Sequence, residues 1–132
     1  MPTPTELARR WFEEVWNDRR EATVDELMAA RMEGYMEGAD IHTPADFKAA
    51  RRQLLDAFPD LRVKVEDIVE QGNTAVLRWS VTATHRGAAL QIPPTNRAVT
   101  FRGITWMEFQ DEQLVRGWDS WNLGGLLQSL RL

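Results

Sequence analysis

Apolar residues in the first 60 positions recur at intervals of three and four, which is the spacing of a helix with one buried face. The first such group is Leu7, Trp11, Phe12, Val15 and Trp16. A threonine followed three residues later by an acidic residue predicts a helix N-terminus at Thr3, Thr23 and Thr43. We therefore expect helices over 4–17, over a short stretch after Thr23, and from Thr43 to the proline at position 59.

From position 61 onward apolar and polar residues alternate, which is the spacing of β-strands with one buried face. Turn-forming residues divide this region into predicted strands near 61–70, 74–85, 98–109 and 113–121. The odd-numbered positions form the apolar face: Leu61, Val63, Val65, Val69, Leu77, Trp79, Val81, Val99, Phe101, Met107, Phe109, Val115 and Trp121. The even-numbered positions are polar apart from one patch, which consists of Ile104, Trp106 and Trp118. A β-bulge would exchange the two faces locally.

Helices followed by an antiparallel sheet predict a single α+β domain over residues 1–132. Because long strands twist, we expect a curved sheet of about four long strands wrapped around three N-terminal helices as a cone-shaped half-barrel. The segment 123–130 mixes leucines with two glycines and predicts a turn or a short helix. A cavity between the sheet and the helices is the expected place for a small ligand.

The 132 residues include no cysteine, which excludes disulfides, thiolate metal sites and thiol nucleophiles and is typical of a reducing compartment. No apolar run approaches the ~20 residues that a membrane span needs. We therefore expect a soluble, cytoplasmic protein. A net charge of −4 without a basic cluster argues against nucleic acid or an anionic membrane as a partner. The expected partner is a small hydrophobic molecule.

Asp119 is the main candidate for chemistry because it lies on the inward parity between two tryptophans. Burial among aromatic rings raises the pKa of a carboxyl group toward neutrality, as a general acid or base requires. The alternative is a carboxylate at the rim, bonded to a backbone N–H or to a neighbouring arginine. Thr105 shares this parity on the adjacent strand, where it either bonds to Asp119 or to a ligand, or serves only as a β-branched strand residue.

Other side chains are candidates for the cavity wall. His85 ends a predicted strand and is expected to be solvated or bonded within the protein, whereas His42 either lines the mouth or faces water. Tyr35 and Glu37 lie between two glycines near the expected open end, and Glu37 is either a second cavity carboxylate or a solvated charge. The remaining expected lining residues are Phe58, Trp79, Met107 and Trp121. Two histidines without metal-ligand spacing predict no metal site.

The patch of Ile104, Trp106 and Trp118 interrupts an otherwise polar sheet face. Exposed aromatic residues of this kind indicate a protein contact, most simply a two-fold homodimer. The alternative is partial cover by the C-terminal segment.

Short motifs spread over nearly the whole chain are ARRWFEEVWN at 8–17, FPDL at 58–61, THRG at 84–87, IPPT at 92–95, VTFRGI at 99–104, Trp118-Asp119 and Leu126-Leu127. Together they resemble the SnoaL-like polyketide cyclase family of the NTF2-like superfamily. This resemblance implies a cone-shaped α+β barrel and implies that Asp119 is the acid/base of a cofactor-free aldol closure. The family often has histidine at the position of Thr105. An enolate would then need another donor, and Tyr35, Thr105 and the tryptophan indole N–H groups are the candidates.

We therefore expect a small-molecule enzyme that uses no cofactor and performs acid/base chemistry, such as aldol cyclisation, isomerisation or hydration. The alternative is a non-catalytic ligand-binding or dimerisation module of the same fold, whose sign would be a cavity filled by aromatic side chains. An epoxide hydrolase ranks last, because it would need an Asp-Arg-Asp cluster around a water and the pattern places only one aspartate inside.

Overall fold

The computed structural model describes residues 1–131, apart from the side chain of Ala89. Its helices are α1 (Pro4–Trp11), the π-helix η1 (Phe12–Asn17), α2 (Ala22–Leu27), α3 (Pro44–Ala57), the 3-10 turn η2 (Ala89–Gln91) and α4 (Leu123–Leu130). Its strands are β1 (Met28–Met36), β2 (Ala39–Ile41), β3 (Arg62–Gln71), β4 (Thr74–Thr84), β5 (Ala98–Gln110) and β6 (Gln113–Trp121).

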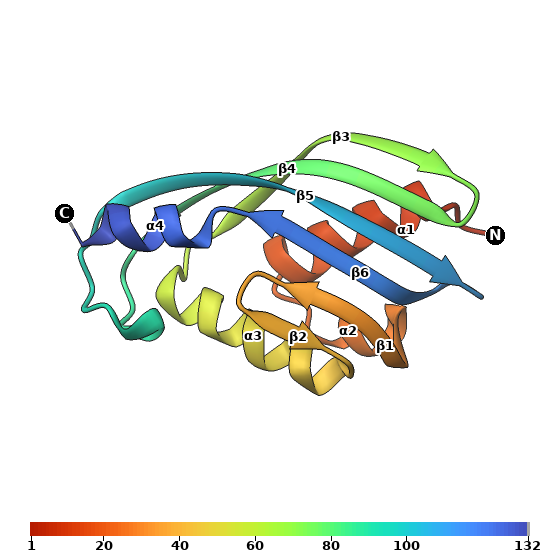
Figure 1. Cartoon of the computed structure of the whole chain (residues 1–132), viewed down its shortest axis with the longest axis horizontal. Coiled ribbons are helices and arrows are strands. Elements are labelled where there is room, and N and C mark those ends of the chain that lie inside the picture. Colours follow the sequence, from red (N-terminus) through yellow and green to blue (C-terminus); the bar gives the residue numbers. More distant parts are fainter. Residues whose placement is uncertain (132) are drawn as a thin grey trace.

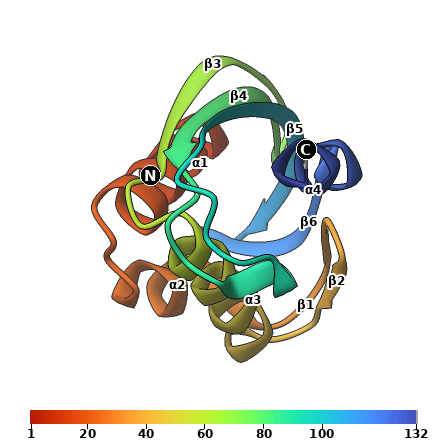
Figure 2. The same cartoon turned by 90° about the vertical axis from the view of Figure 1, so that its left-hand side faces the viewer.

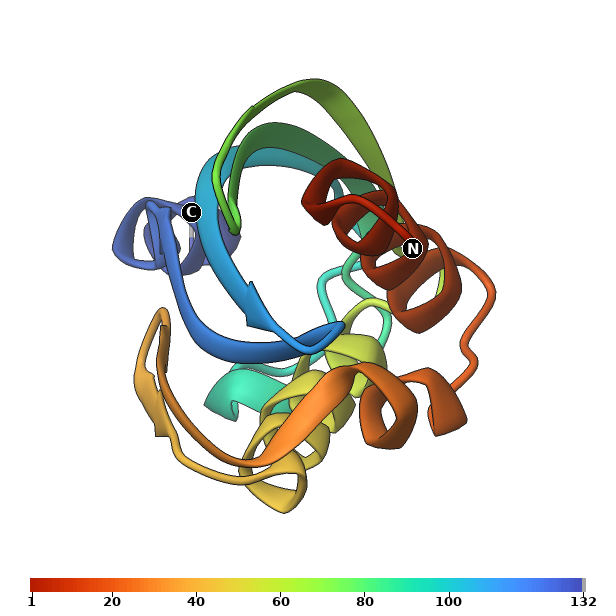
Figure 3. The same ribbon diagram turned by 90° about the vertical axis from the view of Figure 1, so that its right-hand side faces the viewer.

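The strands form one curved sheet in the order β2-β1-β6-β5-β4-β3. The four strands β3 to β6 occupy the predicted segments to within one or two residues, and neighbours among them pair antiparallel. The sheet curls over α1 and α3 (Figure 1), and an end-on view shows the half-barrel (Figure 2). From the opposite end, α1 lies beside β3, and α3 packs against β1 (Figure 3). The predicted α+β class is confirmed.

Two of the three predicted helix starts are confirmed. Thr3 caps α1 by accepting a hydrogen bond from the backbone N–H of Glu6 (3.1 Å), and Thr43 forms a capping box at the start of α3. Together α1 and η1 span the predicted first helix. The prediction at Thr23 is wrong, because Thr23 lies inside α2 with its hydroxyl buried and donating to the carboxylate of Glu14 (2.7 Å).

The expected strand count of about four is too low, because residues 28–41 form the hairpin β1–β2. Its residues include alanine, arginine, methionine and glutamate, which favour helices when considered alone. In the fold β1 pairs in parallel with β6, and Met28, Met32 and Met36 are buried against the core. Pairing with a strand distant in the sequence therefore overrides the local preference, and the sheet is mixed.

The inward face of the sheet follows the predicted odd parity with two exceptions, one on β3 and one at the start of β6, where a register shift against β5 buries Leu114 and leaves the predicted inward residue Val115 partly exposed. The register between β3 and β4 shifts between Val65 and Asp67, which marks a β-bulge. Beyond it Ile68 points inward, and Val69 is 66% exposed instead of buried.

An aromatic layer crosses the middle of the sheet. Trp79 and Trp121 are both in register with Gly103, which lies between them on β5. Their ring centroids are 6.4 Å apart, and Phe101 stacks on Trp121 at 4.9 Å. A Cβ atom at Gly103 would lie 2.6 Å from the Trp79 ring and 2.8 Å from the Trp121 Cβ. The absence of a side chain at this position therefore allows the two indoles to meet.

The helix α4 forms where a turn or short helix is predicted. Asn122 caps it by accepting from the backbone N–H of Gly125 (2.8 Å), and Leu126 and Leu130 are buried. The helix lies beside the end of β6 and the beginning of β5 (Figure 1). The predicted outer patch remains exposed. In this patch Ile104 is 52% exposed, Trp106 is 45% exposed and Trp118 is 40% exposed. Within residues 1–131, no helix has the length and apolarity needed to cross a membrane.

Replacing Gly103 by alanine is expected to destabilise the protein by about 1–3 kcal/mol, because the added methyl group displaces two packed indoles. Chemical denaturation followed by circular dichroism measures this change. Gly117→Ala is the matched control, since a Cβ there has its nearest neighbour at 3.6 Å. Equal stability of the Gly103→Ala and wild-type proteins would contradict the packing described for the aromatic layer.

Candidate active site

Asp119 lies on β6 directly opposite Thr105 on β5. The Thr105 hydroxyl donates to Asp119 Oδ1 (2.7 Å), and the Trp79 indole Nε1–H donates to the same hydroxyl oxygen (2.8 Å). An indole nitrogen can only donate, so Thr105 accepts from Trp79 and its single proton points to the carboxylate. Of the two interpretations of Thr105, the structure shows the one in which it bonds to Asp119.

This hydrogen-bond chain leaves one carboxylate oxygen available. Within residues 1–131, no protein group bonds to Asp119 Oδ2, whereas Oδ1 is taken by Thr105. When the carboxyl group is neutral, its proton therefore resides on Oδ2. The hydrogen-bond chain ends at the Trp79 indole, which cannot accept a proton. These hydrogen bonds therefore orient Asp119 and do not carry its proton away.

The pKa of Asp119 is raised to about 6. Loss of water around the carboxylate is the largest cause, because burial penalises the charged form. The hydrogen bond from Thr105 opposes this by stabilising the carboxylate, and the negative charge of Glu37 raises the pKa further. A carboxyl group with this pKa changes its protonation state near neutral pH and can either take or give a proton.

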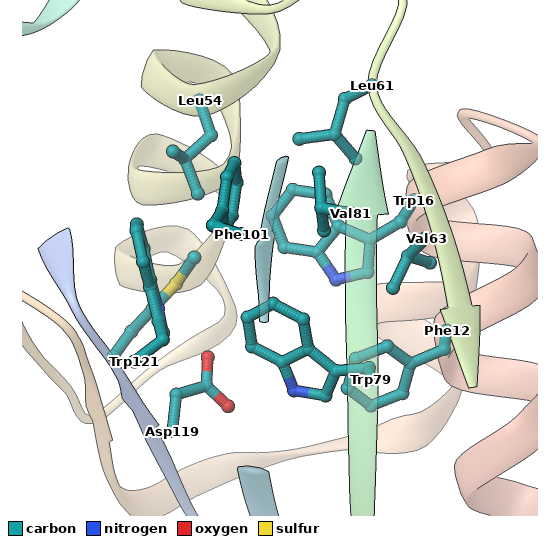
Figure 4. Close-up of a pocket in the computed structure, with 11 residues that line it drawn as sticks. Phe12, Trp16, Leu54, Leu61, Val63, Trp79, Val81, Phe101, Asp119 and Trp121 are labelled. Carbon is teal, nitrogen blue, oxygen red and sulfur yellow. The ribbon is translucent and has the colours of Figure 1, made fainter. Parts of the chain in front are cut away.

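Two small cavities border the carboxylate. The first has a volume of about 30 Å³ and is lined by Phe12, Trp16, Met36, Leu54, Leu61, Val63, Trp79, Val81, Phe101, Asp119 and Trp121 (Figure 4). The second has about 50 Å³ and shares Phe12, Trp16, Met36 and Asp119 with the first. These volumes accommodate a few water molecules, whereas ligand pockets usually measure about 300–1,000 Å³. The aromatic side chains therefore fill most of the expected cone cavity.

The predicted lining residues are distributed unevenly around these cavities. Trp79 and Trp121 border the first cavity, and Tyr35, Thr105 and Met107 border the second. Tyr35 is also 40% exposed, and its hydroxyl accepts from the backbone N–H of Gly38 (3.4 Å). Phe58 lines neither cavity. It is fully buried behind Phe101, with ring centroids 6.1 Å apart.

The two histidines lie outside this cluster. His85 is fully buried with its Nδ1 accepting from the backbone N–H of Thr95 (3.3 Å), so of the two expected arrangements it shows the internally bonded one. The side chain of His42 is exposed and borders neither cavity. Glu37 is partly buried in the turn between β1 and β2. Its interaction with Asp119 is electrostatic. Among the described residues, no group of three acidic or histidine side chains is placed to hold a metal ion.

Several lining residues were absent from the predicted site, namely Phe12, Trp16, Met36 and Phe101. The apolar faces of the first helix and of the sheet indicated burial for most of them. Periodicity does not distinguish a core side chain from one that borders a cavity, so the pattern could not select them.

The chain is similar to known proteins in sequence and in fold. The family model of the SnoaL-like polyketide cyclases matches residues 6–130. A candidate SnoaL-like polyketide cyclase from Jannaschia sp. CCS1 has a TM-score of 0.88 at 22% identity, over 96% of this chain and 90% of that chain. AclR, a candidate hydroxylase from Streptomyces galilaeus, has a TM-score of 0.84 at 26% identity, over 97% and 95% of the two chains. IdmH, a candidate polyketide cyclase from Streptomyces antibioticus, has a TM-score of 0.84 at 20% identity, over 99% and 100%.

No curated protein sequence is significantly similar to the chain. The fold is the NTF2-like α+β barrel, and the family match extends over nearly every residue. The chain belongs to the SnoaL-like polyketide cyclase family.

Replacing Asp119 by asparagine is expected to stabilise the protein above about pH 6 and to lose this advantage below about pH 4. Between these values the folded wild type binds more protons than the unfolded chain, so its stability falls as the pH rises. The raised pKa of Asp119 corresponds to at most about 3 kcal/mol. Denaturant unfolding near pH 4 and pH 8 measures the difference.

Asp60→Asn is the control of opposite sign. Burial acts to raise the pKa of Asp60, but hydrogen bonds from Thr84 and from its own backbone N–H, together with the charge of Arg86, outweigh burial, and the pKa is lowered. Its replacement is therefore expected to destabilise the protein more at high pH than at low pH. If the stability of Asp119→Asn relative to the wild type did not increase as the pH rises, the burial of the Asp119 carboxylate would be contradicted.

Proposed function

We propose that the protein is an enzyme that transfers a proton to and from a carbon atom through Asp119, without a cofactor, in a cyclase-type reaction on a hydrophobic carbonyl compound. The observation that carries the proposal is one oriented carboxyl group with a pKa of about 6 and a free Oδ2 beside an apolar cavity. Membership of the SnoaL-like polyketide cyclase family supports the same reaction class.

In the proposed reaction Asp119 begins as a carboxylate. Its Oδ2 takes a proton from the carbon next to a carbonyl group, and the electron pair of the broken C–H bond becomes part of an enolate. Thr105 holds the other oxygen and provides no route for the proton to leave. The same carboxyl group therefore returns the proton, to the alkoxide formed in an aldol closure or to a second carbon in an isomerisation.

The lining favours a neutral, apolar substrate. Asp119 is the one charged side chain on the wall of either cavity in the described chain, and aromatic rings, aliphatic side chains and methionines form most of the rest. A substrate larger than a few atoms must displace part of this wall. Trp121 is the side chain best placed to move, since it ends β6 and is partly exposed.

The small cavity volumes favour a second candidate function, a non-catalytic ligand-binding or dimerisation module of the same fold. An epoxide hydrolase has less support, because neither cavity is lined by an arginine that could join a carboxylate cluster. For the enzyme we propose a cytoplasmic location, to which the absence of cysteine is suited.

Exchange of the α-protons of 2-tetralone in D₂O, followed by proton NMR, tests the proposed enzyme with a small planar ketone. The wild-type protein is expected to accelerate exchange above the buffer rate, with activity rising with pH to a plateau around a midpoint near 6, as Asp119 ionises. Asp119→Asn is expected to remove at least about 99% of this activity while leaving the fold intact.

The control for this experiment is Asp60→Asn, whose carboxylate lies outside both cavities. It should retain wild-type exchange. No exchange by the wild type, or equal exchange by Asp119→Asn, would favour the non-catalytic module.

We further propose that two copies associate through the outer patch of Ile104, Trp106 and Trp118. Trp106 and Trp118 lie directly opposite each other on β5 and β6, and Tyr35 of β1 continues the row. Light scattering is expected to give twice the mass of one chain and to give the monomer mass for Trp106→Arg. Thr82→Arg, at the other end of the same face, should remain dimeric. A monomeric wild type at micromolar concentration would refute the dimer.

A further inference from the structure

Trp16 is a buried side chain on the wall of the cavities next to Asp119, and its indole N–H is a hydrogen-bond donor. It is 8% exposed and borders both cavities that the Asp119 carboxylate borders. Its ring packs edge-on against Phe47 with centroids 5.9 Å apart. Figure 4 shows the indole nitrogen on the side of the ring that faces the cavity, with Asp119 on the opposite wall.

The π-helix η1 sets the position of this ring. A backbone bond from Asp18 N–H to Glu13 carbonyl oxygen spans five residues (2.8 Å) and widens the helical turn. Asn17, which follows Trp16 in the sequence, exchanges two hydrogen bonds with the backbone of Val63 on β3 (2.9 and 2.8 Å). These contacts attach η1 to the sheet and hold Trp16 against the cavity.

The indole N–H of Trp16 lacks an acceptor within residues 1–131, in contrast to those of Trp79 and Trp106, which donate to Thr105 and Glu108. It is not sealed inside the core either. Among the described side chains, the polar atom that is fully enclosed without a partner is His85 Nε2. The Trp16 nitrogen is therefore not fully enclosed, and because its ring borders both cavities, an acceptor on a bound ligand would satisfy it.

We propose that Trp16 Nε1–H is the donor that binds the carbonyl oxygen of the ligand, opposite the Asp119 carboxylate. The catalytic part of this assignment rests on the proposed function. As Asp119 Oδ2 takes the proton from the adjacent carbon, the C–H electron pair forms the enolate and negative charge builds up on the oxygen. Trp16 stabilises that charge without giving up its proton, and the charge disappears when Asp119 returns the proton.

The other candidate donors are less suitable. The hydroxyl proton of Thr105 is already used by Asp119. Tyr35 is largely at the surface of the β1–β2 hairpin and borders only the second cavity. Trp11 also borders only the second cavity. Trp16 is thus the buried donor common to both spaces beside Asp119. A neutral donor at this position favours neutral ligands that carry a carbonyl or enol oxygen.

Binding of 2-naphthol and of naphthalene tests this assignment without requiring turnover. 2-Naphthol resembles the enol of 2-tetralone, and naphthalene has the same ring system without the oxygen. The preference for 2-naphthol, given by the ratio of the two dissociation constants, is expected to fall about tenfold in Trp16→Phe. Trp11→Phe makes the same chemical change in the second cavity only and should alter the ratio less than about twofold.

A nitrogen-15 NMR titration of the wild type keeps the test valid if Trp16→Phe does not fold. Addition of 2-naphthol should shift one indole N–H signal downfield, and that signal should persist in Trp11→Phe. An unchanged ratio in Trp16→Phe, no indole shift, or no binding of 2-naphthol would overturn the assignment.

Exchange of 2-tetralone separates this assignment from the proposed function. Trp16→Phe is expected to lower the exchange rate about 100-fold while leaving the midpoint of the pH profile near 6. If wild-type exchange is absent but the 2-naphthol preference depends on Trp16, the binding assignment stands and the catalytic function fails. If exchange depends on Asp119 but not on Trp16, the function stands and Trp16 is not the donor.

Discussion

The meeting of Trp79 and Trp121 across Gly103 is the packing constraint on which the site depends. It places the Trp79 indole N–H against Thr105, which in turn directs its single proton to Asp119. The same rings exclude water from the carboxylate, and this burial is the main reason that its pKa is raised. Core packing and the proposed acid/base chemistry therefore depend on the same side chains.

This arrangement couples the stability of the fold to the proposed activity. A charged carboxylate beside apolar rings costs folding free energy, yet a pKa near neutrality is what a proton-transfer group requires. The rings also leave only about 30 and 50 Å³ beside Asp119, so the interior that supports the fold limits what can enter. Binding of a substrate must draw on movement of the wall, and Trp121 at the end of β6 is one of the lining side chains that are only partly buried.

Much of the fold could be predicted from the sequence because strong periodic patterns are local. Alternation predicted β3 to β6, and the cap residues predicted α1 and α3. The inward position of Asp119 also followed from parity. The strand β1 could not be predicted, since its residues favour a helix and only pairing with β6 makes it a strand. Val69 was misplaced because a bulge shifts the register. The filled cavity and the free N–H of Trp16 depend on side-chain packing in three dimensions, which periodicity does not describe.

The proposed function depends on Asp119 being a buried carboxyl group that ionises near neutral pH. The most direct measurement is a carbon-13 NMR titration of its carboxyl carbon, assigned by the signal that disappears in Asp119→Asn. A single transition with a pKa of about 6 is expected. A transition near or below about 4, the ordinary range for a solvated aspartate, would contradict it.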